Sequence, residues 1–198
     1  ATPAAAASPS PTAPPIVVAI GDSIMAGYGL DTGQDWPTMM AAQSGAGVTN
    51  LACSGAGFIA VGSCGTDFAG LIDQAAQAEP TTVIVQGSDN DGDETDKAID
   101  SATTDTVTAI HEAMPDALIV GLSTLWDPPR TEPHEITASS TAVQDAVEAV
   151  GGIYIDIGQP LQDGTGLLQS DDEHPTLAGQ KVLLQTISTA LARAGVTL

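Results

Sequence analysis

Short apolar segments alternate along this chain with longer segments of helical periodicity, and this alternation restricts the possible folds more than any other feature. The first apolar segment, residues 16–20 (IVVAI), is rich in β-branched residues and has no polar position, as expected of a strand buried on both faces. Further strands are predicted at residues 47–52, 81–86, 117–123 and 152–157, and helices at 36–43, 67–78, 94–114, 139–150 and 177–194, the last capped by Thr176. Five strands alternating with helices predict an α/β domain in which helices cover both faces of a five-stranded parallel sheet.

The chain length of 198 residues fits one domain, which we place at residues 16–198. Aromatic residues make up only 3% of the sequence, so Ala, Val, Ile and Leu must fill the core, which suits helices packed on a parallel sheet. Residues 1–15 (ATPAAAASPSPTAPP) contain neither the charged nor the apolar region of a signal peptide. We interpret them as a flexible segment that remains after a signal peptide is removed, outside the folded domain.

The formal net charge is -21, with Lys97, Arg130, Lys181 and Arg193 as the four strong cations. Such a surface repels phosphate backbones and anionic headgroups, which argues against nucleic acid and anionic membrane surfaces as partners. No apolar run is long enough to cross a bilayer. We expect a secreted, extracellular and monomeric protein, and we interpret its acidity as keeping the exported protein soluble.

Two cysteines, Cys53 and Cys64, are close together in the sequence. Two thiols cannot form the usual four-ligand zinc site, and we expect no metal. In a chain with features of export, such a pair predicts a disulfide, and a closed loop of about a dozen residues would contribute roughly 3 kcal/mol of stability. The alternative is two free, buried thiols.

Reactive residues follow four of the predicted strands. The segments are 21–23 (GDS), 54–57 (SGAG), 87–91 (GSDND) and, after a longer loop, 171–175 (DDEHP). In an open parallel sheet ligands bind outside the carboxyl ends of the strands, so we expect these segments to gather at one edge. Together they supply a hydroxyl, free backbone amides, a carboxamide, an imidazole and a carboxylate, the groups that acyl transfer through a covalent intermediate requires.

These segments also carry a resemblance to a known family. GDSIMAGYG, NLACSGAG, QGSDND and DDEHP, in this order, resemble the four blocks of the SGNH (GDSL-type) hydrolase superfamily, and the resemblance extends from residue 16 to the end of the chain. It implies a flavodoxin-like three-layer α/β/α sandwich and a serine esterase that needs no cofactor.

The resemblance assigns roles residue by residue. The nucleophile falls on Ser23, its base on His174, and the carboxylate that orients the base on Asp171. The oxyanion hole would consist of the backbone N–H groups of Ser23 and Gly55 and the side-chain amide of Asn90. These roles agree with general chemistry, because a serine hydroxyl needs a base to take its proton, and a carboxylate fixes the tautomer of that base.

The third block departs from the family pattern, which usually reads Gly-x-Asn-Asp. Here Ser88 occupies the glycine position, with Gly87 one place earlier. A second register would put Asp89 on the asparagine position. Since a carboxylate there would repel the developing oxyanion, we prefer Asn90 as the donor.

Other assignments remain open at this point. Gly57 competes with Gly55 in the second block, and Asp172 and Glu173 compete with Asp171 as the orienting carboxylate. Ser23 alternatively caps the first helix, and Asn90 alternatively only stabilises its turn. Trp126 and Arg130, in the loop after the predicted strand at 117–123, either line the pocket for the acyl or alcohol group or only pack their loop. We interpret His111 and His134 as structural or exposed.

The acidic run at residues 89–96 raises the question of calcium, but it fails the EF-hand pattern, which requires glycine at the sixth position. We expect instead a solvated loop followed by an acidic helix start.

The sequence thus predicts a secreted esterase that hydrolyses carboxylic esters with short acyl or acetyl groups, small or carbohydrate-linked, through an acyl-enzyme on Ser23. Two alternatives are an O-acyltransferase that uses the same site and a non-catalytic carbohydrate- or cell-wall-binding module on the same scaffold.

Overall fold

The computed structural model describes residues 13–126, 131–162 and 164–198, and it confirms the predicted alternation of strands and helices. The strands are β1 (Ile16–Ile20), β2 (Gly47–Asn50), β3 (Thr82–Gln86), β4 (Leu118–Leu122) and β5 (Ile153–Ile155). The helices are α1 (Ser23–Ala26), α2 (Trp36–Ser44), α3 (Ile72–Gln77), α4 (Asp96–Ala113), α5 (His134–Ala149) and α6 (Leu177–Arg193), with short 3-10 helices η1 (Ala69–Leu71) and η2 (Asp89–Asp91). Most of the expected amino-terminal flexible segment, and Arg130, lie outside the described residues.

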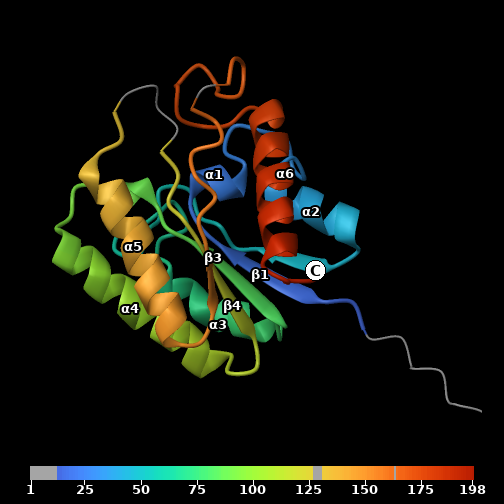
Figure 1. Cartoon of the computed structure of the whole chain (residues 1–198), viewed down its shortest axis with the longest axis vertical. Helices are drawn as coiled ribbons and strands as arrows, with labels where there is room; N and C mark the ends of the chain where they lie inside the picture. The colour runs from blue at the N-terminus through green and yellow to red at the C-terminus, as the bar shows by residue number, and fades with distance from the viewer. Residues whose placement is uncertain (1–12, 127–130, 163) are drawn as a thin grey trace, which may run out of the picture.

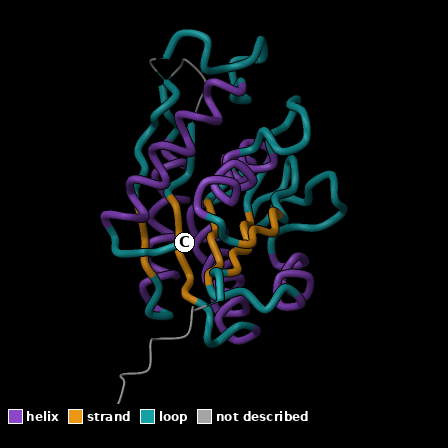
Figure 2. The backbone as a smooth tube through the Cα atoms, turned by 90° about the vertical axis from the view of Figure 1, so that its right-hand side faces the viewer, coloured by secondary structure: helices purple, strands orange, loops and turns teal. Residues whose placement is uncertain are grey.

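All five strands are parallel, in the order β2-β1-β3-β4-β5. Helices α2 and α6 lie on one side of this sheet, and α4 and α5 lie on the other (Figure 1). This is the three-layer α/β/α sandwich that the sequence predicts. The chain passes from β1 outward to β2 and then returns to β3 on the opposite side of β1, which creates a topological switch point beyond the carboxyl ends of β1 and β3. In Figure 2 long loops rise beyond the upper ends of the strands.

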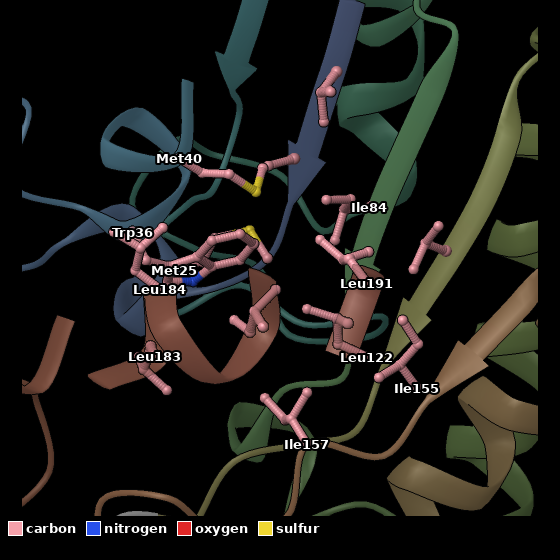
Figure 3. Close-up of a cluster of buried hydrophobic side chains, with 14 of the residues drawn as sticks. Met25, Trp36, Met40, Ile84, Leu122, Ile155, Ile157, Leu183, Leu184 and Leu191 are labelled. Atoms are coloured by element: carbon pink, nitrogen blue, oxygen red, sulfur yellow. The ribbon is translucent and has the colours of Figure 1, made fainter. Parts of the chain in front are cut away.

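Alternate residues of the strands fill two apolar layers. In β1, Val17 and Ala19 pack with side chains of α2 and α6, whereas Val18 and Ile20 pack with those of α3, α4 and α5. Trp36 on α2 is completely buried in the first layer. Figure 3 shows side chains from α2, α6 and the strands meeting there. Burial on both faces explains why the strands read as continuous apolar runs rather than alternating ones.

Three helices differ from the sequence expectation. Helix α3 begins at Ile72, five residues after the predicted start at residue 67, because the preceding residues 69–71 form the 3-10 helix η1. Helix α5 begins at His134, five residues before the predicted start at residue 139. The prediction missed this start because the first turn is mostly polar and only Ile136 there is buried. Helix α1 was not predicted, since four residues are too short to show a periodicity. Thr176 caps α6 as expected, its hydroxyl accepting the N–H of Gly179 at 3.2 Å.

A disulfide joins Cys53 to Cys64, with a Cα–Cα distance of 5.9 Å, which confirms the prediction. It closes the loop that follows β2 and that carries the second block of the sequence pattern. Within the described ranges, no helix combines the length and hydropathy that a bilayer crossing requires.

Candidate active site

Ser23 is the first residue of α1, directly beyond the carboxyl end of β1. The carboxylate of Asp22 caps this helix by accepting the N–H of Ile24 at 2.9 Å, so the capping role considered for Ser23 belongs to its neighbour. Gly27 ends the helix with φ of 72°, a left-handed conformation that glycine adopts without strain. The end of β1 and the cap at Asp22 precede Ser23, and the cap at Gly27 follows it. These three features therefore fix the backbone around the largely buried Ser23.

The structure brings Ser23 together with His174 and Asp171, which are far away in sequence. The hydroxyl oxygen of Ser23 lies 2.9 Å from Nε2 of His174, and Nδ1 of the same ring lies 2.9 Å from Oδ2 of Asp171. This is the hydrogen-bond chain through which a serine can be deprotonated by an imidazole that a carboxylate orients.

Asp171 is also tied to the backbone of its own turn. Its Oδ1 accepts the N–H of Glu173 at 3.1 Å and the N–H of His174 at 3.0 Å. Asp172 occupies the left-handed region with φ of 58°, which turns the chain between the carboxylate and the ring. In the described part of the chain no hydrogen bond joins the side chain of Asp172 or Glu173 to the imidazole, so the geometry favours Asp171 among the three acids.

Gln169 attaches this turn to the loop after α1. Its backbone N–H donates to the carbonyl of His174 at 2.7 Å, and its side-chain amide donates to the carbonyls of Tyr28 at 2.7 Å and Pro175 at 2.9 Å. The half-exposed ring of Tyr28 packs against the imidazole of His174, with centroids 4.4 Å apart. The imidazole of His174 is therefore held by a carboxylate at one edge and packs against an aromatic ring.

The hydrogen bonds around Asp171 change its acidity. Partial desolvation, the largest single influence, raises the pKa of Asp171, but the bonds from the backbone and ring of His174 and from the N–H of Glu173 outweigh it and lower the pKa from 3.8 to about 2. Because the folded state favours the ionised form, Asp171 contributes stability above pH 3.8 that is lost as the pH falls through about 2.

We expect the acid limb of log kcat/KM against pH to have a slope of one. Asp171 keeps its charge down to about pH 2, so above pH 4 it should add no second inhibitory protonation to that of an imidazole base. Measurement of ester hydrolysis from pH 8 to pH 3.5 tests this. A slope of two near pH 4 would show a second inhibitory protonation, at Asp171 or at the buried Asp22, whose pKa burial raises, and would contradict this expectation.

Gly55 and Gly57 differ in what their backbone N–H groups do. The N–H of Gly57 donates to the carbonyl of Ala60 at 3.0 Å. The N–H of the exposed Gly55, where φ is 78°, donates to no acceptor in the described residues. Among the two candidates that the sequence left open, the geometry therefore supports Gly55 as a donor toward a ligand.

Asn90 lies in η2, beyond the carboxyl end of β3. Its side-chain amide donates to the hydroxyl of Ser88 at 2.8 Å and to the carbonyl of Ala56 at 3.2 Å. The amide thus reaches across to the loop that carries Gly55, on the switch-point side of the sheet. A hollow of about 360 Å³ adjoins it, with Trp126, Pro133 and Ile136 in its lining.

The expectation of a solvated acidic loop after β3 is wrong at Asp91. This carboxylate is 1% exposed and accepts three backbone N–H groups, from Phe58 at 2.8 Å, Ile59 at 3.1 Å and Ala60 at 2.8 Å. Asp91 is therefore a structural anchor for the disulfide loop. One indirect signal in the sequence is Gly57, where an added Cβ would clash with the carboxylate of Asp91.

The two other histidines lie away from this cluster. His134 begins α5 and bonds to Asp96 at 2.8 Å with both side chains more than half exposed, and this hydrogen bond raises the pKa of His134. His111 lies in the last turn of α4. Trp126 is buried, its backbone N–H donating to Gln159 at 2.8 Å.

Several solved structures share this fold. TesA superposes with a TM-score of 0.71 at 23% identity, over 90% of this chain and 98% of TesA. The psychrotrophic esterase EstA from Pseudoalteromonas sp. gives 0.70 at 19% identity, over 90% and 97% of the two chains. A family two carbohydrate esterase from Clostridium thermocellum, in complex with cellohexaose, gives 0.73 at 17% identity, over 98% of this chain and 68% of that one.

Among curated protein sequences, none matches this chain. The structural likenesses, all below 25% identity, establish the shared fold. The family model for GDSL-like lipases and acylhydrolases, in contrast, matches residues 19–182, from β1 into α6. On that match, this chain belongs to the GDSL-like lipase/acylhydrolase family.

Proposed function

We propose that this protein is a secreted esterase that hydrolyses short-acyl carboxylic esters, small or carbohydrate-linked, through an acyl-enzyme on Ser23. The observation that carries the proposal is the continuous hydrogen-bond chain from Ser23 through His174 to Asp171, with 2.9 Å at each step. A binding module has no need of an imidazole aligned with a serine hydroxyl at one ring nitrogen and with a carboxylate at the other.

This geometry supports the following reaction. The oxygen of Ser23 attacks the ester carbonyl carbon while its proton passes to Nε2 of His174. The tetrahedral intermediate then collapses, the bond to the alcohol oxygen breaks, and His174 returns the proton to the leaving alkoxide. Water, deprotonated by the same imidazole, next attacks the acyl-enzyme, and Ser23 departs as a hydroxyl. Asp171 stays ionised throughout and stabilises the imidazolium.

Negative charge on the intermediate requires donors on the side away from His174. The backbone N–H groups of Ser23 and Gly55 and the amide of Asn90 are proposed for that role. Loss of one such donor typically lowers the rate by about a hundred- to a thousand-fold. In the present geometry the amide of Asn90 donates to Ala56 over a comparatively long 3.2 Å, a bond that an oxyanion can replace.

The surroundings of the site support a small substrate. The hollow beside Asn90 measures about 360 Å³, near the lower end of the usual range for ligand pockets. Asn90, rather than Ser23 or His174, is the proposed site residue in its described lining, and we take the hollow as the space for the acyl group. Tyr28 offers an exposed ring next to the imidazole that would protonate the leaving alcohol. A ring-bearing alcohol such as a sugar would meet an aromatic surface there. The net charge of -21 favours neutral or cationic esters over anionic ones.

Hydrolysis of p-nitrophenyl acetate, butyrate and octanoate tests the proposal. We expect kcat/KM to be highest for acetate or butyrate and roughly tenfold lower for octanoate. A small pocket cannot hold the longer acyl chain, and the transition state would lose on the order of 1.4 kcal/mol of binding free energy. Product analysis with added glycerol separates hydrolysis from transfer. Dominant formation of acylglycerol would identify an O-acyltransferase, and a rate that rises toward octanoate would contradict the short-acyl assignment.

A further inference from the structure

The buried hydroxyl of Ser88 is the centre of a hydrogen-bond group that joins the buried Asp22 to the exposed Asn90. It donates to Oδ2 of Asp22 at 2.8 Å and accepts both the backbone N–H of Asn90 at 3.1 Å and the side-chain amide of Asn90 at 2.8 Å. One donated and two accepted bonds use the full capacity of a hydroxyl. With 1% of its surface exposed, Ser88 is shielded from competing water.

Asp22 determines which way the Ser88 hydroxyl points. Burial raises the pKa of Asp22, and the hydrogen bond from Ser88 acts in the opposite direction by stabilising the ionised carboxylate. Its other oxygen accepts the N–H of Ile24. A bond from a hydroxyl to a carboxylate is stronger than one to a neutral acceptor, so the proton of Ser88 is committed to Asp22. The lone pairs of Ser88 are then left facing Asn90.

This arrangement selects one orientation of the Asn90 carboxamide. A lone pair on Ser88 attracts the amide nitrogen and repels the amide oxygen, so the flipped rotamer would lose a bond and bring two acceptors together. The second amide hydrogen, which Ser88 does not hold, is directed at the carbonyl of Ala56 at 3.2 Å. That hydrogen is the one available to a negatively charged oxygen of a substrate.

We propose that Ser88 is a positioning residue that holds the Asn90 carboxamide with its nitrogen toward the substrate oxyanion, with Asp22 orienting Ser88 in turn. The inference rests on the proposed esterase function. It assigns a purpose to the departure at this position, where the resemblance places glycine, because a glycine has no hydroxyl to fix the amide. Through Ser88, the hydrogen bonds also connect Asn90, the proposed oxyanion donor, to Asp22, which precedes Ser23 in the sequence.

The kinetic experiment compares Ser88→Ala, Ser88→Cys and Ser88→Thr with the wild type on p-nitrophenyl acetate. Alanine removes the hydroxyl, cysteine keeps the approximate volume with poor hydrogen bonding, and threonine keeps the hydroxyl. We expect kcat to fall about ten- to thirtyfold for Ala and Cys, below the full loss of an oxyanion donor. KM should change less than about twofold, and Thr should restore most of kcat.

A double variant separates positioning from a merely structural role. In an Asn90→Ala background, Ser88→Ala should lower kcat by less than about twofold, because no amide remains to orient. Independent, multiplying losses would overturn the inference, as would an unchanged kcat in Ser88→Ala. A variant that shows only a lower Tm would assign Ser88 to capping the turn of η2 and would equally overturn it.

A spectroscopic readout keeps the test independent of turnover. In the wild type the two side-chain amide protons of Asn90, identified by their absence in Asn90→Ala, should have well-separated NMR shifts and slow solvent exchange. Both properties should be lost in Ser88→Ala and retained in Ser88→Thr. If the wild type hydrolyses no ester, the esterase proposal fails while this measurement still decides whether Ser88 orients the amide.

Discussion

Replacement of Ser23 by alanine is expected to lower kcat/KM for p-nitrophenyl acetate by about 10⁴-fold or more, the range found when a nucleophilic serine is removed from a catalytic triad. No other hydroxyl is shown within hydrogen-bond distance of Nε2 of His174 in the described residues, so none can replace it. Steady-state hydrolysis by the two purified proteins measures the effect. The fold should be retained, because the hydroxyl makes a single bond and the caps of α1 come from Asp22 and Gly27.

Covalent labelling supplies the matching control. A fluorophosphonate should label the wild type at one equivalent on Ser23 and leave Ser23→Ala unlabelled. Ser101→Ala, which removes an exposed serine on α4, should keep both activity and labelling. Full turnover in Ser23→Ala would refute the assignment of the nucleophile. A folded wild type that is neither active nor labelled would favour the non-catalytic carbohydrate-binding module.

The sheet could be predicted from the sequence because its strands are buried on both faces. The five residues of β1 match the predicted segment at both ends, since the apolar run and the following Gly21 mark the same boundaries that the backbone uses. Helix α5 shows the opposite case. Its first turn contributes only Ile136 to the core, so apolar periodicity begins to be visible only after the helix has started.

The site was predictable where a motif marks a residue and unpredictable where only folding supplies the partner. The order of the sequence blocks indicated Ser23 and His174, which the fold then brings to 2.9 Å across 151 positions of sequence. A choice among three consecutive acids required the backbone turn at Asp172, which no local pattern reveals. In the sequence, Ser88 is visible only as a departure from the family pattern. Its hydrogen-bond partner Asp22 is 66 positions away, so no local pattern could reveal the contact.

Asp91 explains why the acidic loop after β3 was misjudged and leads to the second large effect. Charge alone predicts a solvated carboxylate, but three backbone N–H groups in the disulfide loop donate to this one and offset the free-energy cost of its burial. Asp91→Ala would leave those donors unsatisfied and open a void against Gly57. We expect the free energy of unfolding to fall by about 4 kcal/mol, which is a large fraction of the ~5–15 kcal/mol typical of a domain.

Urea denaturation measures this loss as a lower midpoint with an unchanged m-value. Asp93→Ala is the matched control, because it removes the same charge two residues away from an exposed position and should stay within about 0.5 kcal/mol of the wild type. If both variants lost the same stability, the effect would come from net charge rather than from the three N–H groups. Activity should respond as well, because Gly55 belongs to the loop that Asp91 and the Cys53–Cys64 bridge hold in place. A folded Asp91→Ala protein is therefore expected to hydrolyse esters more slowly than Asp93→Ala at the same temperature.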